Sequence, residues 1–580
     1  MCKVIFRHCD SRKRGWIAGR GFAGLIEARR PEDVADALAQ ADAAAQKGLW
    51  AAGFVAYEAA AGLDEHLAVH RAADLPLVWL ALFEGLAPSP DLPGGAEEFR
   101  IGPWEPSVSL EDYQRVILAI KEWIASGDTY QVNYTIRLRS AFRGSPEALF
   151  ARLWQAQGAD CCAFIDTGRW AICSASPELF FQLDGDEVVC RPMKGTARRG
   201  LWPEQDRQRH RELSCSAKDR AENAMIVDMV RNDVGRIAQS RSVRVRQVFA
   251  IEKYPTVYQM TSTVACRTEA TLPGLFRAMF PCASVTGPPK VRTMQIIREL
   301  EPQPRGVYTG AIGYWGPGRR GRFNVAIRTV VIDKPAGRAE YGVGGGIVWD
   351  SQGQAEYAEC QAKASVLTAQ RPEFELLETL RYDGAGGYFL LEEHLRRLAQ
   401  SAEYFDFAVD IPAVRRRLAD LAAGLIAPAR VRLRVGKQGQ AHLETAPAPA
   451  WNRPEPWRLK LADHPVAPED PFLYHKTTQR RVYDEAFERR GDCDDVLLWN
   501  DRGELTETTR ANIVLELDGQ RVTPPVSCGL LGGVMRASLL ASGQVTERVC
   551  TLGDLARCRG VHAINSVRGW MKVSLAFCHE

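Results

Sequence analysis

The amino-acid sequence predicts an α+β fold in each of two successive parts of the chain. Apolar residues recur at helical spacing over residues 110–126, whereas a short apolar run over 75–83 is typical of a strand. The pattern restarts near residues 370–372, where a new strand and then a new helix follow a proline. The 580 residues have room for three or four domains of ordinary length.

The composition is that of a globular protein and excludes several classes. Hydrophobic residues make up 46% of the chain and the net charge is +3, so neither nucleic acid nor a membrane is expected as a partner. The fifteen cysteines follow no disulfide or zinc pattern, which fits a reducing compartment. The N-terminus lacks the apolar core of a signal peptide, and no apolar run reaches 18 residues. We therefore expect a cytoplasmic protein.

Three domains are expected from the order of the predicted elements. Residues 1–105 form an N-terminal region with a helix over 31–47, strands over 51–58 and 75–83, and a linker over 88–95. Residues 106–368 form the first catalytic domain, which begins with the helix over 110–126 and then turns to strand character. Residues 372–580 form the last domain.

Lys194 is the first candidate for catalysis. It lies between Pro192, which fixes the backbone, and Gly195, which leaves space beside it. An amine is nucleophilic near neutral pH only when burial or nearby cations lower its pKa, and Arg191, Arg198 and Arg199 could supply such cations. The alternative is an ordinary lysine in a polar turn.

Two carboxylates belong with this lysine. Glu178 stands at a strand edge, and a hairpin through residues 188–189 would bring it back toward Lys194 as an acid. Glu222 lies on the same side of a helix as an apolar stripe, where a carboxylate needs a partner such as a metal ion. Alone, each glutamate could equally be an exposed surface residue.

A later segment adds a third group of residues. Residues 341–348 are expected to form a glycine-rich turn after a strand, and a helix follows. Such turns let backbone amides approach an anion. On the helix, Glu359 and Lys363 are four residues apart and share one face, as in an ordinary surface ion pair.

Taken in order, these blocks resemble the chorismate-utilising enzymes. Residues 50–368 look like aminodeoxychorismate synthase component I, a large sheet structure with helices outside. The resemblance rests on six ordered blocks of sequence: 192–196, 221–233, 284–290, 308–314, 325–329 and 342–346.

The resemblance implies a role for each candidate. Lys194 would add covalently to the chorismate ring as the hydroxyl leaves, and ammonia would then displace it; the related anthranilate synthases usually carry alanine there. Glu178 would be the general acid, while Glu222 and Glu359 would bind magnesium, which suits hard oxygen ligands. The implied substrate-binding residues are Arg328, Tyr308, Thr286, Lys363, Gly344, Gly345 and Gly346.

One position departs from many relatives. Gln259 stands where anthranilate synthases have a histidine associated with the elimination of pyruvate. Glutamine cannot titrate, so this part of the chain is expected to release its amino product intact.

The last domain has its own lysine, Lys476, followed by two further blocks over 503–514 and 530–536. A lysine for a Schiff base, a carboxylate beside a pyridine nitrogen and amides for a phosphate are what pyridoxal phosphate needs. The set is similar to the fold-type IV pyridoxal phosphate enzymes. That resemblance makes Lys476 the internal aldimine and Glu507 the partner of the pyridine nitrogen. It implies a phosphate site formed by Arg397, Val534 and Met535, and a pocket wall at residues 565–568.

The sequence thus predicts a chorismate-utilising fold followed by a smaller fold-type IV domain. By resemblance, the chain would aminate chorismate and then release pyruvate to give 4-aminobenzoate for folate biosynthesis. The alternatives are an anthranilate- or isochorismate-forming first part, a branched-chain or D-amino-acid aminotransferase in the second part, and a second part without catalysis. A separate glutamine amidotransferase subunit would supply ammonia, and a homodimer through the last domain is compatible with the sequence.

Overall fold

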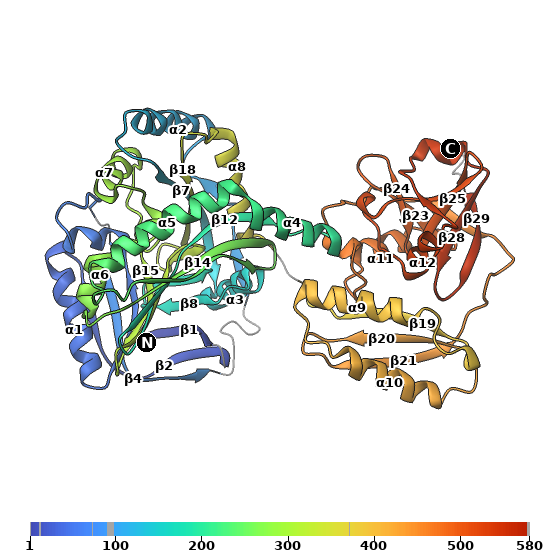
Figure 1. Ribbon diagram of the computed structural model, residues 1–580, viewed down its shortest axis with the longest axis horizontal. Helices are drawn as coiled ribbons and strands as arrows, with labels where there is room; N and C mark the ends of the chain where they lie inside the picture. The colour runs from blue at the N-terminus through green and yellow to red at the C-terminus, as the bar shows by residue number, and fades with distance from the viewer. Residues whose placement is uncertain (1, 11–12, 72–73, 90–97, 370–371, 577–580) are drawn as a thin grey trace. The chain divides into compact units, whose positions relative to one another are not determined.

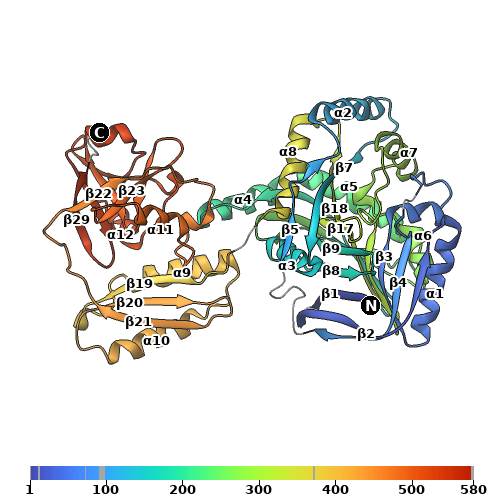
Figure 2. The same ribbon diagram turned by 180° about the vertical axis from the view of Figure 1, so that it is seen from behind.

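The computed structural model describes residues 2–10, 13–71, 74–89, 98–369 and 372–576. The chain divides into two compact units. The first comprises Met1–Arg199 and His210–Arg371, and the second comprises Gly200–Arg209 and Pro372–Glu580. Figures 1 and 2 show the elements of both units from two opposite sides.

The first unit is built around one antiparallel sheet. Within the described residues, eighteen strands are linked into this sheet by hydrogen bonds. They are β1 (Lys3–Asp10), β2 (Lys13–Ala28), β3 (Trp50–Val55), β4 (Val78–Ser89), β5 (Phe99–Ile101), β6 (Glu105–Pro106), β7 (Val132–Gly144), β8 (Cys161–Asp166), β9 (Trp170–Ser176), β10 (Leu179–Asp184), β11 (Glu187–Arg191), β12 (Met193–Arg198), β13 (Arg244–Lys253), β14 (Val257–Arg267), β15 (Ala311–Gly316), β16 (Arg320–Val325), β17 (Thr329–Asp333) and β18 (Arg338–Ile347).

The pairing of these strands joins segments that are far apart in the chain. One path of antiparallel neighbours runs β7–β18–β17–β9–β8–β1–β2–β4–β3–β15–β16–β10–β11–β14–β13, and β12 also pairs with β14. The strands of residues 1–105 therefore belong to the same sheet as the strands that carry Lys194 and the glycine run.

Eight helices lie in the described part of the chain before residue 370, and the fourth of them begins within Gly200–Arg209, the stretch that belongs to the second unit. They are α1 (Val34–Gln46), α2 (Leu110–Ala125), α3 (Pro146–Gln157), α4 (Pro203–Cys215), α5 (Ala217–Gly235), α6 (Leu272–Met279), α7 (Lys290–Leu300) and α8 (Gly353–Ala364). Helices α1, α5 and α6 bury Leu38, Val230 and Phe276 in one core, whereas α2 and α3 bury Ile117 and Phe150 in another. Helices α2 and α8 lie side by side in both views (Figures 1 and 2).

Two predicted elements of the first unit differ in the structure. The run of glycines from 342 to 346 is not a turn but the end of strand β18, which pairs with β7 so that Gly346 faces Asn133. Residues 51–58 form strand β3 and then a short 3₁₀ helix that begins at Tyr57. The predicted linker over 88–95 lies largely outside the described residues. The helix predicted over 110–126 is α2, which Ser109 caps by accepting a hydrogen bond from the amide of Asp112.

The second unit contains two sheets. A three-stranded antiparallel sheet, β19–β20–β21, is followed by a mixed sheet that has eight strands within the described residues. The strands are β19 (Leu376–Tyr382), β20 (Ala429–Val435), β21 (Ala441–Pro447), β22 (Trp457–Leu461), β23 (Asp495–Trp499), β24 (Leu505–Thr508), β25 (Asn512–Leu517), β26 (Gln520–Thr523), β27 (Thr546–Glu547), β28 (Gly560–Asn565) and β29 (Gly569–Ala576). The helices are α9 (Leu391–Phe405), α10 (Ile411–Ala423), α11 (Arg481–Glu488) and α12 (Val534–Ala541).

Strand β20 divides the small sheet into a core face and an open face. Its residues Val431 and Leu433 are buried against Leu398 of α9 and Leu418 of α10. Side chains alternate along a strand, so the residues between them, such as Arg432, point to the other side of the sheet. That other side borders the pocket described below.

The described cysteines are free thiols, and most of them are buried. In the described ranges no helix is long and apolar enough to cross a membrane.

Candidate active sites

The first unit contains a cavity of about 890 Å³. It is lined by the start of β12, by α5 and α8, by the glycine run of β18 and by the segment around Glu178. Five separate stretches of sequence therefore meet at one site. Most of the residues that the sequence singled out for the first part of the chain line this cavity.

Lys194 projects into the cavity from strand β12. Its Nζ lies 3.6 Å from Oε2 of Glu222, and its side chain is 21% exposed. Asn223, the next residue of α5, donates a hydrogen bond of 3.2 Å to the Lys194 carbonyl and so ties this part of β12 to the helix. A Cβ atom at Gly346 would lie 2.8 Å from Nζ, so the glycine leaves the space that the amine occupies.

Of the three arginines expected around this amine, Arg198 lines the cavity, whereas the other two contact other groups. Arg191 lies 3.4 Å from Glu252. Arg199 donates a hydrogen bond to the carbonyl of Tyr254. Lys194 itself forms an ion pair with the carboxylate of Glu222.

Glu178 is 2% exposed and lies between β9 and β10. The predicted hairpin is formed by β10 and β11, in which Leu179 pairs with Arg191. Burial raises the pKa of Glu178 to about 7, although Ser284, the amide of Met193 and the charge of Lys194 oppose the increase. Within the described residues its Oε1 has no hydrogen-bond partner. This carboxyl is thus suited to hold a proton near neutral pH and to give it to a bound group.

Glu222 and Glu359 come together from α5 and α8. Glu222 contacts Lys194 and, at 4.0 Å, Lys218, while Glu359 forms a 2.7 Å ion pair with Lys363. Burial would raise the pKa of Glu359, but the Lys363 ammonium outweighs it, and the pKa is lowered. Lys194 and Lys218 also act on Glu359, which places both carboxylates near the same two amines.

The residues present fit a magnesium ion in donor type. Glu356, one turn before Glu359, adds a third carboxylate to the cavity wall and accepts a hydrogen bond of 2.7 Å from Ser351. Among the described residues no group of three or more His, Cys, Asp or Glu side chains has the arrangement of a complete metal site. Magnesium often takes only one or two protein carboxylates and completes its shell with water and substrate oxygens.

The residues expected to bind substrate carboxylates are arranged around the glycine run. Lys363 donates a 2.7 Å hydrogen bond to the Gly344 carbonyl, and the Arg328 guanidinium donates to the Lys363 carbonyl. Tyr308 is packed against Gly342, where a Cβ would lie 2.2 Å from its ring. All of these residues line the cavity, as do Gly345 and Gly346.

Thr286 is the exception among the predicted residues of this site. It is fully buried and is not part of the cavity wall; its hydroxyl donates to the carbonyls of Cys282 and Ala283. Gln259 does line the cavity, and its Oε1 accepts a 3.0 Å hydrogen bond from the hydroxyl of Thr196.

The sequence did not single out Gln131, which the structure places beside the same amine. A Cβ at Gly346 would lie 2.8 Å from the Gln131 side-chain amide as well as from Nζ of Lys194. Gln131 is fully buried, and neither atom of its amide has a hydrogen-bond partner within the described residues. Nothing in the sequence around Gln131 indicates that it lies beside Lys194. Gln131 directly precedes β7, and only the pairing of β7 with β18 brings it next to Gly346 and the amine.

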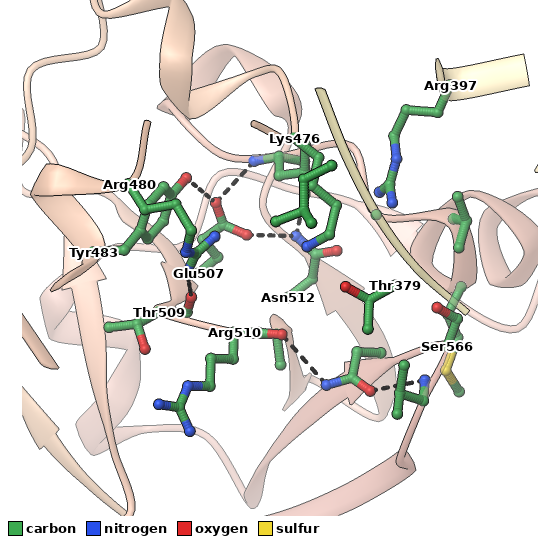
Figure 3. Close-up of a pocket in the computed structure, with 18 of the residues that line it drawn as sticks. Thr379, Arg397, Lys476, Arg480, Tyr483, Glu507, Thr509, Arg510, Asn512 and Ser566 are labelled. Carbon is green, nitrogen blue, oxygen red and sulfur yellow. Dashed lines mark hydrogen bonds between the residues drawn. The ribbon is translucent and has the colours of Figure 1, made fainter. Parts of the chain in front are cut away.

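The second unit contains a pocket of about 360 Å³ (Figure 3). Its wall includes each residue that was predicted for a pyridoxal phosphate site: Lys476, Glu507, Arg397, Val534 and Met535. Figure 3 shows Lys476 and Arg397 pointing into this pocket from different segments.

Lys476 has the environment of a reactive amine. Its pKa is lowered to about 7. Burial is the largest cause, and the decrease caused by the guanidinium groups of Arg480 and Arg397 exceeds the increase caused by the carboxylates of Glu378 and Glu507. A substantial fraction of this amine is therefore neutral at pH 7, as nucleophilic attack on an aldehyde requires.

Glu507 is 4% exposed and is held at a fixed position by three donors. Its Oε1 accepts from the Tyr483 hydroxyl at 2.8 Å and from the Leu531 amide at 2.9 Å, and its Oε2 accepts from Asn512 at 3.2 Å. Burial raises its pKa to about 7. A carboxyl group fixed in this way can share a proton with the ring nitrogen of a bound pyridine.

Arg397 lies between a carboxylate and the loop that leads into α12. It forms two hydrogen bonds to Glu378, of 2.8 and 2.6 Å, and one of 3.4 Å to the Gly532 carbonyl. Burial would raise the pKa of Glu378, but Arg397 outweighs it and the pKa falls to about 2. Helix α12 begins at Val534 with no side-chain cap, so its first amides are available to a phosphate.

These observations fit pyridoxal phosphate chemically. The pocket joins an amine of lowered pKa, a buried carboxyl group, an arginine and an uncapped helix start. The supporting residues Glu378, Tyr483 and Asn512 were missed by the sequence analysis. Glu378 and Asn512 lie in strands whose apolar neighbours gave no reason to mark a single polar residue.

Comparison with known proteins assigns each unit to a class. Residues 89–369 match the family described as chorismate binding enzyme, and residues 375–576 match amino-transferase class IV. Each family model thus matches one region of the chain, and the predicted order of the two folds is confirmed.

Particular relatives are found for the first unit. The chain is 42% identical over 269 residues to aminodeoxychorismate synthase component 1 of Klebsiella aerogenes, a match covering 46% of this chain and 59% of that protein. For the protein of the same name from Escherichia coli K12, the identity is 40% over 269 residues, with the same two coverages of 46% and 59%. The chain thus spans little more than half the length of these relatives.

One solved structure supports the fold of the first unit. Anthranilate synthase component I from Streptococcus pneumoniae TIGR4 superposes with a TM-score of 0.52 at 25% identity. The match covers 61% of this chain and 92% of that chain.

Proposed function

We propose that the first unit converts chorismate and ammonia to 4-amino-4-deoxychorismate and water, and that the second unit splits this product into 4-aminobenzoate and pyruvate. The proposal rests above all on Lys194. Its amine, the buried acid Glu178 and two carboxylates meet in one cavity, and the relatives of this chain include aminodeoxychorismate synthases at 40–42% identity.

In the first reaction, the Lys194 amine attacks the chorismate ring while the ring hydroxyl leaves. Glu178, with a pKa of about 7, gives its proton to the departing oxygen. Ammonia then displaces the lysine from the ring. Glu222 and Glu359 would hold magnesium, whose charge would attract a substrate carboxylate; Arg328 and Lys363 lie in the wall that this carboxylate faces.

The product of the first unit keeps its enolpyruvyl group in this proposal. Gln259 lines the cavity and accepts a hydrogen bond from Thr196, but it has no proton that titrates near neutral pH. Pyruvate would therefore not be released until the product reaches the second unit.

In the second unit, Lys476 would hold the aldehyde carbon of pyridoxal phosphate, and Arg397 with the amides at Val534 and Met535 would hold its phosphate. The cofactor supplies a ring that accepts the electrons released when a proton leaves the substrate. Glu507 would keep a proton at the pyridine nitrogen. The Lys476 amine would take the proton from the substrate ring carbon that must lose it for aromatisation.

An aminotransferase is the second candidate for this unit, because the family it matches is amino-transferase class IV. Both reactions use the same lysine and the same carboxyl group. They differ in outcome, since a transaminase leaves the amine on the cofactor and consumes a keto acid.

The experiment is to incubate the purified protein with chorismate, magnesium and ammonium salt, with and without pyridoxal phosphate, and to identify the products by mass spectrometry. We expect 4-aminobenzoate and pyruvate with the cofactor, and 4-amino-4-deoxychorismate without it. Anthranilate as product would refute the assignment of the first unit. Accumulation of 4-amino-4-deoxychorismate in the presence of pyridoxal phosphate would refute that of the second.

Ammonia would come from a separate glutamine amidotransferase subunit, since the relatives are components 1 of their enzymes. In its absence, glutamine should not replace the ammonium salt. A cytoplasmic location and a homodimer through the second unit stay predictions.

A further inference from the structure

Three arginines on one side of the second-unit pocket have no assigned role. Arg430 comes from strand β20, Arg510 from the turn between β24 and β25, and Arg568 from the turn between β28 and β29. In the parts of the chain that the structure describes, none of the three forms an ion pair. By contrast, Arg397 of the same pocket is paired with Glu378, and Arg432 lies 3.9 Å from Glu444.

Two of these arginines are held in place by neighbouring groups. The guanidinium of Arg510 lies 3.9 Å from the centre of the Phe487 ring, and that of Arg568 lies 5.5 Å from the Trp457 ring. Asn565 links their loops, because its Nδ2 donates to the Arg510 carbonyl at 3.3 Å and its Oδ1 accepts from the Arg568 amide at 2.8 Å. These contacts fix the two loops, so the cluster is an ordered part of the pocket wall.

The three charges act on one another. The pKa of Arg568 is lowered, first by burial and then by the charges of Arg510 and Arg430, which only Asp495 opposes. Guanidinium groups that repel one another in a partly desolvated wall are unfavourable in the empty pocket. A bound anion would remove that cost, and a carboxylate accepts two parallel hydrogen bonds from a guanidinium.

The cluster is separate from the end of the pocket suited to phosphate. Figure 3 shows Arg510 and Arg397 on opposite sides of Asn512. The phosphate end contains Arg397 and the start of α12. An anion at Arg510 would therefore belong to the substrate rather than to the cofactor.

We propose that Arg430, Arg510 and Arg568 form a subsite for the carboxylates of a cyclic amine that carries two carboxylate groups. This inference rests on the proposed function, whose intermediate, 4-amino-4-deoxychorismate, has one amine and two carboxylates. A branched-chain amino acid has only one carboxylate, so it has one negative charge fewer to pair with the three arginines. The subsite thus favours the lyase over an amino-acid transaminase.

The test compares Arg430→Gln, Arg510→Gln and Arg568→Gln in the holoenzyme with a matched control, Arg521→Gln. Arg521 belongs to strand β26, pairs with Glu516 at 3.5 Å and is not part of the pocket wall. Each protein is given 4-amino-4-deoxychorismate, and 4-aminobenzoate release is followed. We expect the KM to rise about 10- to 100-fold in each pocket variant, while kcat changes less than about threefold and pyridoxal phosphate affinity is unchanged. The control should behave as the parent protein.

A second measurement does not depend on the lyase reaction. Chorismate has both carboxylates but a hydroxyl in place of the amine, so it serves as a dicarboxylate probe. It is titrated with EDTA present and ammonium absent, and the visible band of bound pyridoxal phosphate reports binding in the second unit alone. We expect a shift that the three pocket variants weaken, and a much weaker shift with 4-hydroxybenzoate, which has one carboxylate.

The outcomes separate this inference from the proposed function. If the parent protein releases no 4-aminobenzoate but chorismate still shifts the band in an arginine-dependent way, the lyase proposal fails and the subsite stands. If 4-aminobenzoate is released and KM stays within twofold in all three variants, the subsite is refuted and the lyase stands. A parallel loss of pyridoxal phosphate affinity would also overturn the subsite, because it would assign these arginines to the cofactor.

Discussion

In each unit the lysine predicted to be reactive lines a cavity, and the surroundings of these two amines differ. Lys194 contacts the carboxylate of Glu222 and lies near Glu359, whereas Lys476 lies among the charges of Arg397 and Arg480. Burial and those cations lower the pKa of Lys476 to about 7. The comparison shows that the surroundings of a lysine, rather than the side chain itself, distinguish the two sites. We expect the reactivity of the Lys194 amine to depend on a cation, such as magnesium, that binds its carboxylate neighbours. We expect the reactivity of the Lys476 amine to depend on its burial and on the neighbouring arginines.

The largest effect is expected for Lys476→Ala. Without this amine the second unit should lose the visible band of bound pyridoxal phosphate, and 4-aminobenzoate release should fall by at least about 10⁴-fold, since both the covalent link and the proton carrier are removed. 4-Amino-4-deoxychorismate should accumulate, as mass spectrometry would detect. Lys460→Ala is the control, because Lys460 pairs with Asp463 outside the pocket. Undiminished 4-aminobenzoate would show that Lys476 is not the reactive lysine.

The next effect is expected for Lys194→Ala. Formation of 4-amino-4-deoxychorismate should fall by about 10³-fold, or about 4 kcal/mol in the barrier, because the nucleophile is lost. The pyridoxal phosphate band should be unchanged, and added 4-amino-4-deoxychorismate should still be cleaved.

Lys218→Ala provides the matched control for charge. Lys218 lies in the same cavity wall, 4.0 Å from Glu222, but its side chain is 75% exposed. A loss as large in this variant as in Lys194→Ala would show that the cavity needs positive charge there rather than a nucleophile.

The pH dependence of cofactor capture tests the environment of Lys476 directly. Attack on the aldehyde needs the neutral amine, and the lowered pKa of about 7 means that the neutral fraction rises as the pH increases through that value. The rate at which the cofactor-free protein binds pyridoxal phosphate should rise about tenfold between pH 6 and pH 8 and then level off. Stopped-flow absorbance would measure it. A rate that keeps rising toward pH 10 would mean that the amine has an ordinary pKa.

The smallest effect is expected for Gly346→Ala. The new methyl group would lie 2.8 Å from Nζ of Lys194 and from the Gln131 amide, so the amine must move. We expect kcat for chorismate amination to fall about fivefold, because small misplacements of a nucleophile are costly, while stability changes by less than about 1 kcal/mol.

Gly235→Ala is the matched glycine control, since a Cβ at Gly235 would meet no atom within 4 Å. Equal kcat values for Gly346→Ala and the parent protein would show that the amine position is not critical. A large loss of thermal stability in Gly346→Ala would instead indicate a disturbed strand.

Much of both sites could be predicted from sequence because their chemistry needs particular residue types in a particular order. Lys194 and Glu222 belong to ordered blocks, Glu178 and Glu359 were singled out by their neighbours, and the structure places all four in one cavity wall. In the same way, Lys476 and Glu507 belong to the blocks that suggested a pyridine ring and its phosphate. The pattern of apolar residues likewise predicted helix α2 and the restart of the chain near residue 372.

Other features could not be predicted because they depend on which strands pair. The glycines at 342–346 were expected in a turn, since glycine is common there, but the pairing of β18 with β7 extends them into a strand. Thr286 belongs to a motif and is nevertheless buried behind the cavity.

The sequence by itself predicted the class of each unit and its candidate reactive side chains, because nucleophiles, acids and phosphate-binding turns have local chemical requirements. Only the tertiary structure decided what surrounds those side chains. Three features depend on segments that are far apart in the chain. They are the Gln131 amide beside Lys194, which has no hydrogen-bond partner within the described residues, the pairing of Glu378 with Arg397, and the convergence of Arg430, Arg510 and Arg568. Electrostatic and packing energies depend on distance in space, so residue spacing along the chain could not reveal them.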